Sequence, residues 1–148
     1  MDRAFRALMV LALFLAIGGL TNYLLQERVK DKHIKIAFIA NAVATAIPIK
    51  LRVQEYYAMN DELPSSNEML NLRPPEGFKG NGLHSIAVEQ GGVIHLRFGK
   101  DEQSISGNIF LIPDSINDQF YGEWLCLTPN YQTIEKWIPQ CRYQPVGG

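Results

Sequence analysis

The chain has 148 residues, 47% of them hydrophobic, and its 14 lysines and arginines nearly balance its 15 aspartates and glutamates. This length fits one domain with at most an appendage, and a net charge of −1 excludes a strongly basic, polyanion-binding protein.

The first predicted element is a membrane-anchor helix over residues 1–26, because residues 7–26 carry no charged side chain. About 20 residues rising 1.5 Å each are long enough to cross the apolar core of a bilayer. A cleavable secretory signal and a buried core helix are the alternatives. The first lacks a small-x-small cleavage site after the apolar run, and the second is unusual at a chain terminus. We therefore expect the lipid bilayer to be a partner.

A charged stretch, ERVKDKHIK, leads from this anchor into a second helical segment. Apolar residues recur at steps of three and four between Ile36 and Tyr57, which predicts an amphipathic continuation of the helix over residues 27–59. Pro48 removes one backbone donor and should bend the helix there. Only 14 residues separate Lys35 from Lys50, too few for a second membrane span.

Residues 60–148 are predicted to form a globular head. Helix-breaking residues between Asn60 and Lys79 indicate a long ordered loop with one short helical turn after Ser66. The period then changes to two, which predicts four strands, with QGG at 90–92 as the first hairpin turn: Leu83–Glu89, Val93–Phe98, Gly107–Pro113 and Glu123–Leu127. The predicted fold class is α+β, a long N-terminal helix packed on a four-stranded antiparallel sheet.

The sequence gives no support for an enzyme. Alternation in the first strand predicts Leu83 and Ser85 on one face and His84 on the other. His84 would then face His95, which belongs to the second strand of the hairpin. Two histidines without a third ligand more often lie on a sheet surface, so we expect no metal and no cofactor. No phosphate-binding glycine loop stands between a strand and a helix.

Both cysteines of the chain, Cys126 and Cys141, lie fifteen positions apart near its C-terminal end. A bridge between them would contribute about 3 kcal/mol, a large share of a typical stability of about 5–15 kcal/mol. Two buried free thiols are the alternative, and it is disfavoured because irregular, exposed-looking sequence flanks both. The sequence favours a disulfide that bounds a C-terminal region without secondary structure and requires an oxidising compartment.

These elements together resemble a type IV pilin. VQEYYAMNDELPSSNEMLNL (Val53–Leu72) resembles the end of the family's helix and the following loop, and GGVIHLRFG (Gly91–Gly99) resembles its first hairpin. EWLCL and WIPQCR are similar to its disulfide-bounded C-terminal region, with Cys126 and Cys141 at the family's cysteine positions. The resemblance covers about residues 40–143. It implies pilin subunits or pilus assembly proteins as partners.

The N-terminus departs from the pilin pattern. Pilin precursors carry a short basic leader ending in Gly or Ala before a Phe, with a glutamate at the fifth mature position. Ala4 and Phe5 form the possible processing site, but Met9 stands where that glutamate would fall. Without the carboxylate, the free amine created by cleavage would be buried unpaired in a filament, at a large cost. The sequence therefore favours a minor or accessory subunit over a major one.

Two signals disagree about the orientation of the chain in a membrane. Lysines and arginines are more numerous after the anchor than before it, which favours a cytoplasmic head. The disulfide and the pilin resemblance both favour the opposite orientation. We therefore expect a single-pass protein of the bacterial inner membrane with a periplasmic C-terminal domain, incorporated in a pilus or resident in the membrane.

The function predicted is that of a type IV pilin-like, membrane-anchored envelope protein, a structural or accessory subunit in pilus assembly. The alternatives are a minor pilin that captures DNA or another ligand, and an inner-membrane regulator of pilus assembly that is not itself polymerised. Lys79, Arg97 and Arg142 are the candidate surface contacts. Nearby acidic residues offset their charge, so nucleic acid is not expected as a partner.

Overall fold

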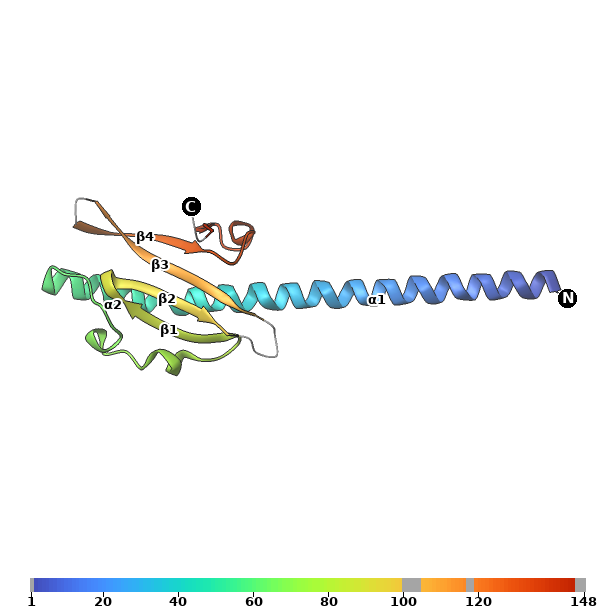
Figure 1. The fold of residues 1–148 in the computed structure, drawn as a ribbon, viewed down its shortest axis with the longest axis horizontal. Coiled ribbons are helices and arrows are strands. Elements are labelled where there is room, and N and C mark those ends of the chain that lie inside the picture. The colour runs from blue at the N-terminus through green and yellow to red at the C-terminus, as the bar shows by residue number, and fades with distance from the viewer. Residues whose placement is uncertain (1, 100–104, 117–118, 146–148) are drawn as a thin grey trace. The chain divides into compact units, whose positions relative to one another are not determined.

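The computed structural model describes residues 2–99, 105–116 and 119–145, with side chains from Leu8 onward. The chain divides into two compact units, Met1–Lys35 and Ile36–Gly148. One helix, α1 (Asp2–Thr45), runs through the first unit and enters the second (Figure 1). The predicted domain boundaries after residues 26 and 59 stay predictions.

The first unit consists of the N-terminal part of α1. It is long and apolar enough to cross a membrane, with a mean hydropathy of 2.1 over its most apolar 18-residue window. Every residue between Leu8 and Leu25 is exposed, including the large side chains Phe14 and Leu15 at 69% and 70%. A helix that is apolar on all sides is stable when lipid or other protein covers it, since water penalises such a surface.

In the second unit the helix is interrupted at Ala46, where α1 ends and α2 (Ile47–Asn60) begins (Figure 1). The predicted effect of Pro48 explains the position, because a proline is tolerated in the first turn of a helix but not in its interior. The helix ends as predicted near residue 60, with Asp61 in the left-handed conformation at φ 56°.

Within the described residues the sheet has five strands, so the prediction of four is wrong by one. The strands lie side by side in chain order, so each pairs with the next one along the chain. The first three pairs are antiparallel, and the last pair is parallel. The five strands are β1 (Leu83–Glu89), β2 (Val93–Phe98), β3 (Gly107–Ile116), β4 (Gln119–Thr128) and β5 (Cys141–Tyr143). β5 has three residues, too few to show a period in the sequence. β3 and β4 are longer than predicted because they pair again beyond a register shift, at Ser115 and Phe120.

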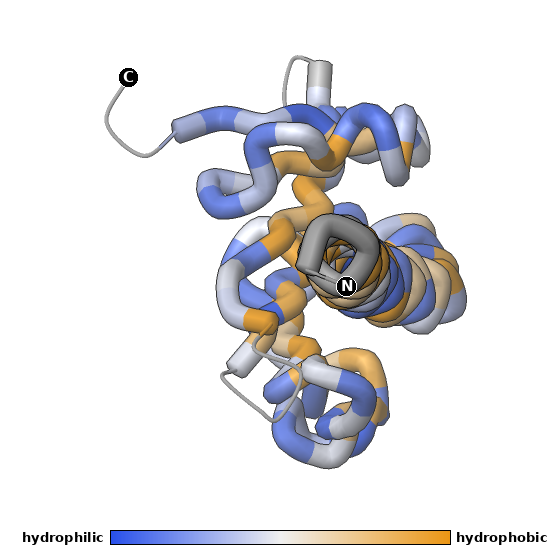
Figure 2. Tube along the Cα trace, turned by 90° about the vertical axis from the view of Figure 1, so that its right-hand side faces the viewer, coloured by the Kyte–Doolittle hydropathy of each residue, from blue (hydrophilic) through white to orange (hydrophobic). Residues whose placement is uncertain are grey.

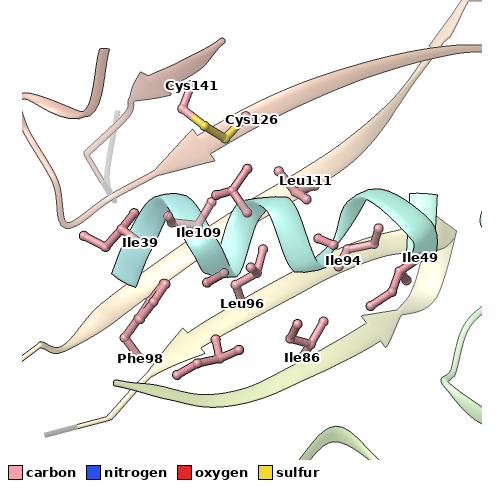
Figure 3. Close-up of a cluster of buried hydrophobic side chains, with 14 of the residues drawn as sticks. Ile39, Ile49, Ile86, Ile94, Leu96, Phe98, Ile109, Leu111, Cys126 and Cys141 are labelled. Carbon is pink, nitrogen blue, oxygen red and sulfur yellow. A yellow bond between two sulfur atoms is a disulfide. The ribbon is translucent and has the colours of Figure 1, made fainter. Parts of the chain in front are cut away.

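The core lies between the inner side of the helix and one face of the sheet, which confirms the predicted packing (Figure 3). Ile39 and Val53 from the helices are 1% and 0% exposed, and Leu96 and Ile109 from the strands are both 0% exposed. Successive residues of a strand point to opposite sides of the sheet, so every second residue of a strand points toward the helix and contributes to this face. In Figure 2, hydrophobic segments of the chain lie beside the helix, and hydrophilic segments lie towards the outside.

The predicted faces of β1 are wrong at its first residues because a bulge interrupts the alternation. Leu83 pairs with Phe98, but Ser85 pairs with Arg97, so His84 is the extra residue. Leu83 is consequently buried with the core, while His84 is exposed. A bulge of this kind leaves no mark in the apolar pattern.

The hairpin at 90–92 is confirmed, and it packs closely on the rest of the head. Gly92 has φ +71°, and a Cβ there would lie 3.1 Å from Val53 Cγ1 and 3.2 Å from Leu63 Cδ2. Its amide donates to the Pro64 carbonyl at 2.8 Å. Glycine is therefore required for this turn to contact both the helix and the following loop.

The long loop after α2 is ordered, as predicted, but it contains two helical turns in place of one: η1 (Glu68–Leu70) and η2 (Pro75–Phe78). Asn67, 5% exposed, joins the loop to the sheet. Its Nδ2 donates to the carbonyls of Arg73 and Ile86, both at 3.0 Å, and its Oδ1 accepts from the Val88 amide at 2.6 Å. One side chain thus satisfies backbone groups of β1 and fixes the loop against it.

We expect Asn67→Ala to lower the free energy of unfolding by about 2–4 kcal/mol, because buried backbone groups of β1 lose their partner. Chemical denaturation of the full chain measures this loss. Asn41→Ala, at an exposed helix position, is the control and should change stability by less than about 0.5 kcal/mol. Equal effects of the two substitutions would contradict the role of Asn67.

Candidate functional site

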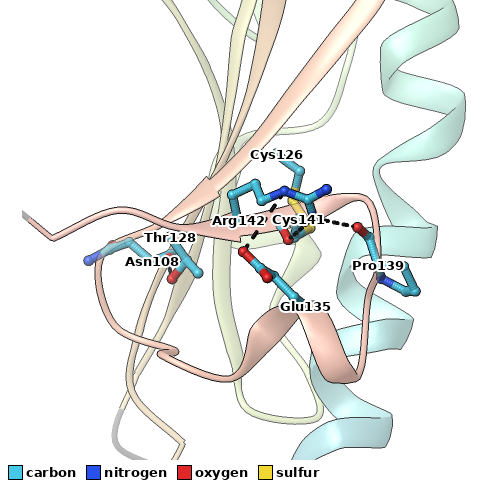
Figure 4. Close-up of a disulfide and its surroundings, with 7 residues drawn as sticks. All are labelled: Asn108, Cys126, Thr128, Glu135, Pro139, Cys141 and Arg142. Atoms are coloured by element: carbon cyan, nitrogen blue, oxygen red, sulfur yellow. Dashed lines mark hydrogen bonds and ion pairs between the residues drawn. A yellow bond between two sulfur atoms is a disulfide. The ribbon is translucent and has the colours of Figure 1, made fainter.

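The two cysteines form a disulfide, as the sequence favours (Figure 4). Cys126 of β4 and Cys141 of β5 stand opposite each other in register, with their Cα atoms 4.4 Å apart. Their exposures are 4% and 0%, so the bridge belongs to the core. The bond holds a three-residue strand at the edge of the sheet, where hydrogen bonds alone would be few.

The segment between the cysteines is not without secondary structure, which corrects the expectation. It contains the 3-10 helix η4 (Ile134–Lys136) and ends in β5. Ile134 and Ile138, 0% and 5% exposed, point into the core from one side of this turn. Their spacing of four residues is a helical signal, but one turn is too short to be recognised in the sequence.

A polar network joins the same segment to β3. Thr128 Oγ1 donates to the Asn108 carbonyl at 2.7 Å, and Asn130 Oδ1 accepts from the Asn108 amide at 2.8 Å. Tyr131 donates its hydroxyl to the Ser106 carbonyl at 3.2 Å. Gly107 permits this approach, since a Cβ there would lie 2.8 Å from Asn130 Cβ. The C-terminal region is therefore fixed by hydrogen bonds as well as by sulfur.

Arg142, one of the predicted surface contacts, holds its own loop (Figure 4). Its Nη1 donates to the Pro139 carbonyl at 2.6 Å and to the Cys141 carbonyl at 3.1 Å. Its Nε lies 3.8 Å from Glu135 Oε1. The guanidinium thus supports the turn into β5, and part of its charge is neutralised where it stands.

The other two predicted contacts, Lys79 and Arg97, are exposed and lie on different elements. Lys79 follows η2, and Arg97 belongs to β2. Strands β3 and β4 separate Arg97 from Arg142, about 14 Å at the usual strand spacing. The arginines therefore do not converge on one site, and the role of all three residues as contacts stays a prediction.

The histidines do not face each other, so that arrangement is wrong. His95 stands opposite Ala87 in the register, while His84 is displaced by the bulge. His95 is 8% exposed, with Nδ1 2.7 Å from Glu89 Oε1 and Nε2 2.8 Å from Asn108 Oδ1. His95, on β2, thus links β1 and β3 through its two ring nitrogens. Within the described ranges no group of three His, Cys, Asp or Glu residues is placed to bind a metal.

A groove that sequence reasoning missed runs between the helix and the disulfide-bounded segment, with a volume of about 340 Å³. Small helix residues, Ala40 and Ala44, line one wall, and Trp137 and Pro139 line the other. Lys50 stands at its end with Nζ 5.3 Å from the centre of the Trp124 ring. Burial lowers the pKa of Lys50, since desolvation disfavours its charge.

The helix wall of this groove continues onto the outer side of the helix, which is apolar and exposed. Ala40, Ala44 and Ile47, which line the groove, and Leu51 beyond it follow one another at steps of three and four, and the last two are 56% and 55% exposed. We call these four residues the helix face. It has no hydrogen-bonding function within the head, and its chemistry suits packing against another apolar surface.

The predicted processing site lies near the start of the chain's first helix. Ala4 and Phe5 lie within α1, and their side chains fall outside the described part of the structure. Cleavage at this site stays a prediction.

Comparison with known families identifies a match over most of the chain. A family model described as pilin, of the bacterial filament, matches residues 37–142. This range contains α2, all strands except the last residue of β5, and both cysteines. It confirms the type IV pilin resemblance drawn from the sequence. No curated protein matches the chain.

We expect the double substitution Cys126→Ala and Cys141→Ala to lower the free energy of unfolding by about 3 kcal/mol, because the unfolded chain regains the entropy of the open loop. Denaturant unfolding with and without reductant measures the effect. Reductant should destabilise the wild type and leave the double variant unchanged. A wild type that is insensitive to reductant in the denaturant would show that the bridge is not formed.

Burial raises the pKa of Tyr131 above its ordinary value of 10.0, because the half-buried site disfavours the phenolate. The neutral Tyr131 side chain therefore makes its full contribution to stability below pH 10.0. Above that pH the phenol ionises more readily in the unfolded chain than in the folded one, so this contribution is lost as the pH rises. We expect Tyr131→Phe to flatten the alkaline fall in stability. Tyr121→Phe, at a residue that is 65% exposed, should leave that fall unchanged.

Proposed function

The chain belongs to the pilin family, and from this premise we propose that it is a membrane-anchored, type IV pilin-like subunit of the bacterial envelope. The proposal places the membrane-anchor segment, residues 1–26, in the inner membrane and the head, residues 60–148 with the helix from residue 27, on the periplasmic side. The protein acts by packing against pilin subunits or assembly proteins, and not by catalysis, in keeping with the structural, non-enzymatic character of the family.

The observation that carries the proposal is the continuity of one helix through both units. An apolar segment whose side chains are exposed from Leu8 to Leu25 is joined without a break to residues that are buried in the head, such as Ile39. A helix of this composition is suited to lipid before assembly and to neighbouring apolar helices afterwards. The disulfide supports the periplasmic side, since such bonds persist in oxidising compartments.

The helix face is the surface that we propose for contact with other subunits. Its residues lie on the part of the helix that is turned away from the sheet, so they are available without any rearrangement of the core. Ala40 and Ala44 permit a close approach of a second helix, and Ile47 and Leu51 provide apolar area. The contact role of Lys79, Arg97 and Arg142 is retained as part of this proposal, at the edges of the head.

We expect Leu51→Asp to reduce the amount of the chain that co-purifies with assembled pili by about tenfold or more, because a carboxylate would be desolvated at the contact. Immunoblotting of sheared pili and of membranes measures the distribution. Leu125→Asp, at a residue that is 45% exposed on the sheet, is the matched control and should leave incorporation unchanged. Equal incorporation of Leu51→Asp and wild type would contradict the role of the helix face.

N-terminal sequencing of the same two fractions separates the roles that the sequence leaves open. A chain that begins at Phe5 in pili supports a polymerised subunit. A chain that begins at Met1 and stays in membranes supports a resident accessory protein or regulator of assembly. Recovery in the cytosol, with neither membrane nor pilus association, would overturn the proposed function.

A further inference from the structure

The face of the sheet that points away from the helix carries a second apolar surface. Ile94, Leu111 and Cys126 point into the core, so their neighbours along each strand point outward. Register then brings five outward side chains into two adjacent rows across β2, β3 and β4, which we call the outer patch: Val93, Phe110, Ile112, Leu125 and Leu127. Leu125 is 45% exposed, and the other four are half-buried.

Charged residues of opposite sign stand at the two ends of the outer patch. Arg97 lies on the same face of β2, one row beyond His95, and is exposed. Glu123 lies at the opposite end, two residues before Leu125 on β4, and is exposed as well. Asp114 stands beside this acidic end, two residues after Ile112 on β3. The patch is therefore apolar in the middle, basic at one end and acidic at the other.

We propose that the outer patch binds the outer patch of a second copy of this chain. Arg97 on β2 and Glu123 on β4 stand at diagonally opposite corners of the outer patch. A two-fold axis that crosses the strands obliquely, at right angles to this diagonal, lays the apolar rows of one copy on those of the other. The same rotation reverses the strand direction, so Arg97 of each copy meets Glu123 of its partner. Stacking without the reversal would place like charges together, so the charge pattern selects this one orientation.

The size of the surface indicates that the association is weak. Three strands spaced about 4.8 Å apart and seven residues rising about 3.3 Å each cover roughly 330 Å² per copy. A dimer would bury about 700 Å² in total, below the usual range for stable complexes. In this one respect the inference rests on the proposed function: confinement of anchored chains to one membrane raises their effective concentration and compensates for the small area.

The association is independent of the proposed filament contacts, because the outer patch and the helix face lie on opposite sides of the sheet. Two copies joined through their outer patches leave Ile47 and Leu51 exposed. The inference and the proposed function therefore fail separately. Leu125→Asp reports on the pairing of sheets, and Leu51→Asp reports on helix packing.

Site-specific photocrosslinking of the full chain in membrane vesicles tests the proposal. The photoreactive residue benzoylphenylalanine replaces Leu125 in one sample and Leu51 of the helix face, which is 55% exposed, in a second sample that reports on helix packing. The control carries it at Met59, which is 78% exposed and belongs to neither surface, and should give no crosslinked dimer. We expect irradiation of the first sample to give a crosslinked species of twice the chain mass. Peptide mapping should place the crosslink on residues of β2, β3 or β4 of the second copy.

Charge reversal provides the second measurement on the same sample. We expect Arg97→Glu alone and Glu123→Arg alone each to reduce the crosslinked fraction roughly fivefold or more, since each creates two like-charge contacts. The combination of both substitutions in one chain should restore it. Non-reducing electrophoresis confirms that each variant keeps its Cys126–Cys141 bond and is folded.

Three results would overturn the proposal: no crosslinked dimer from position 125 at any density of chains in the vesicle, a crosslink that maps to the helix or to lipid, or a charge-reversed double variant that fails to recover. A crosslinked fraction that is equal from positions 125 and 51, with both mapping to helices, would assign the association to the helix face instead.

Discussion

The packing of one helix on one sheet is the contact on which the rest of the head depends. Ala46 and Val53 of the helix and Leu96 of β2 are all 0% exposed, so the helix supplies one side of a single small core. A sheet with one apolar face is not stable in water without such a cover. The packing of the helix on the sheet also determines which helix residues stay on the surface, because a side chain that is buried against β2 and β3 cannot contact a partner.

Two further devices complete this core at its edges. Asn67 closes one side by satisfying backbone groups of β1, and the Cys126–Cys141 bridge closes the other by holding β5 beside β4. Each replaces apolar contacts that a domain of this size has in short supply. One buried side-chain amide and one disulfide thus stabilise the two edges of the head. The helix face and the outer patch take no part in this and are exposed to other molecules.

The sequence predicts the architecture well and the local geometry less well. The apolar period identifies the helix and four strands, and the two cysteines, in a chain predicted to be membrane-anchored, identify the bridge. Three-residue β5 and the turn at Ile134 are too short to carry a period, and the bulge at His84 depends on pairing with β2. The groove beside Ala40 forms where the helix meets residues 137–140, and the outer patch depends on the register of β2, β3 and β4, so no single segment contains either of them.

The central claim is that the helix from Ile36 onward belongs to the core of the head. Native-state hydrogen exchange of the full chain tests it most directly, because exchange from a shared core requires the same unfolding event. The account predicts that the amides of Val43 and Val53 exchange as slowly as those of Leu96 and Ile109. Helix amides that exchange many times faster than those of β2 and β3 would show that the sheet is stable without the helix, and would contradict the account.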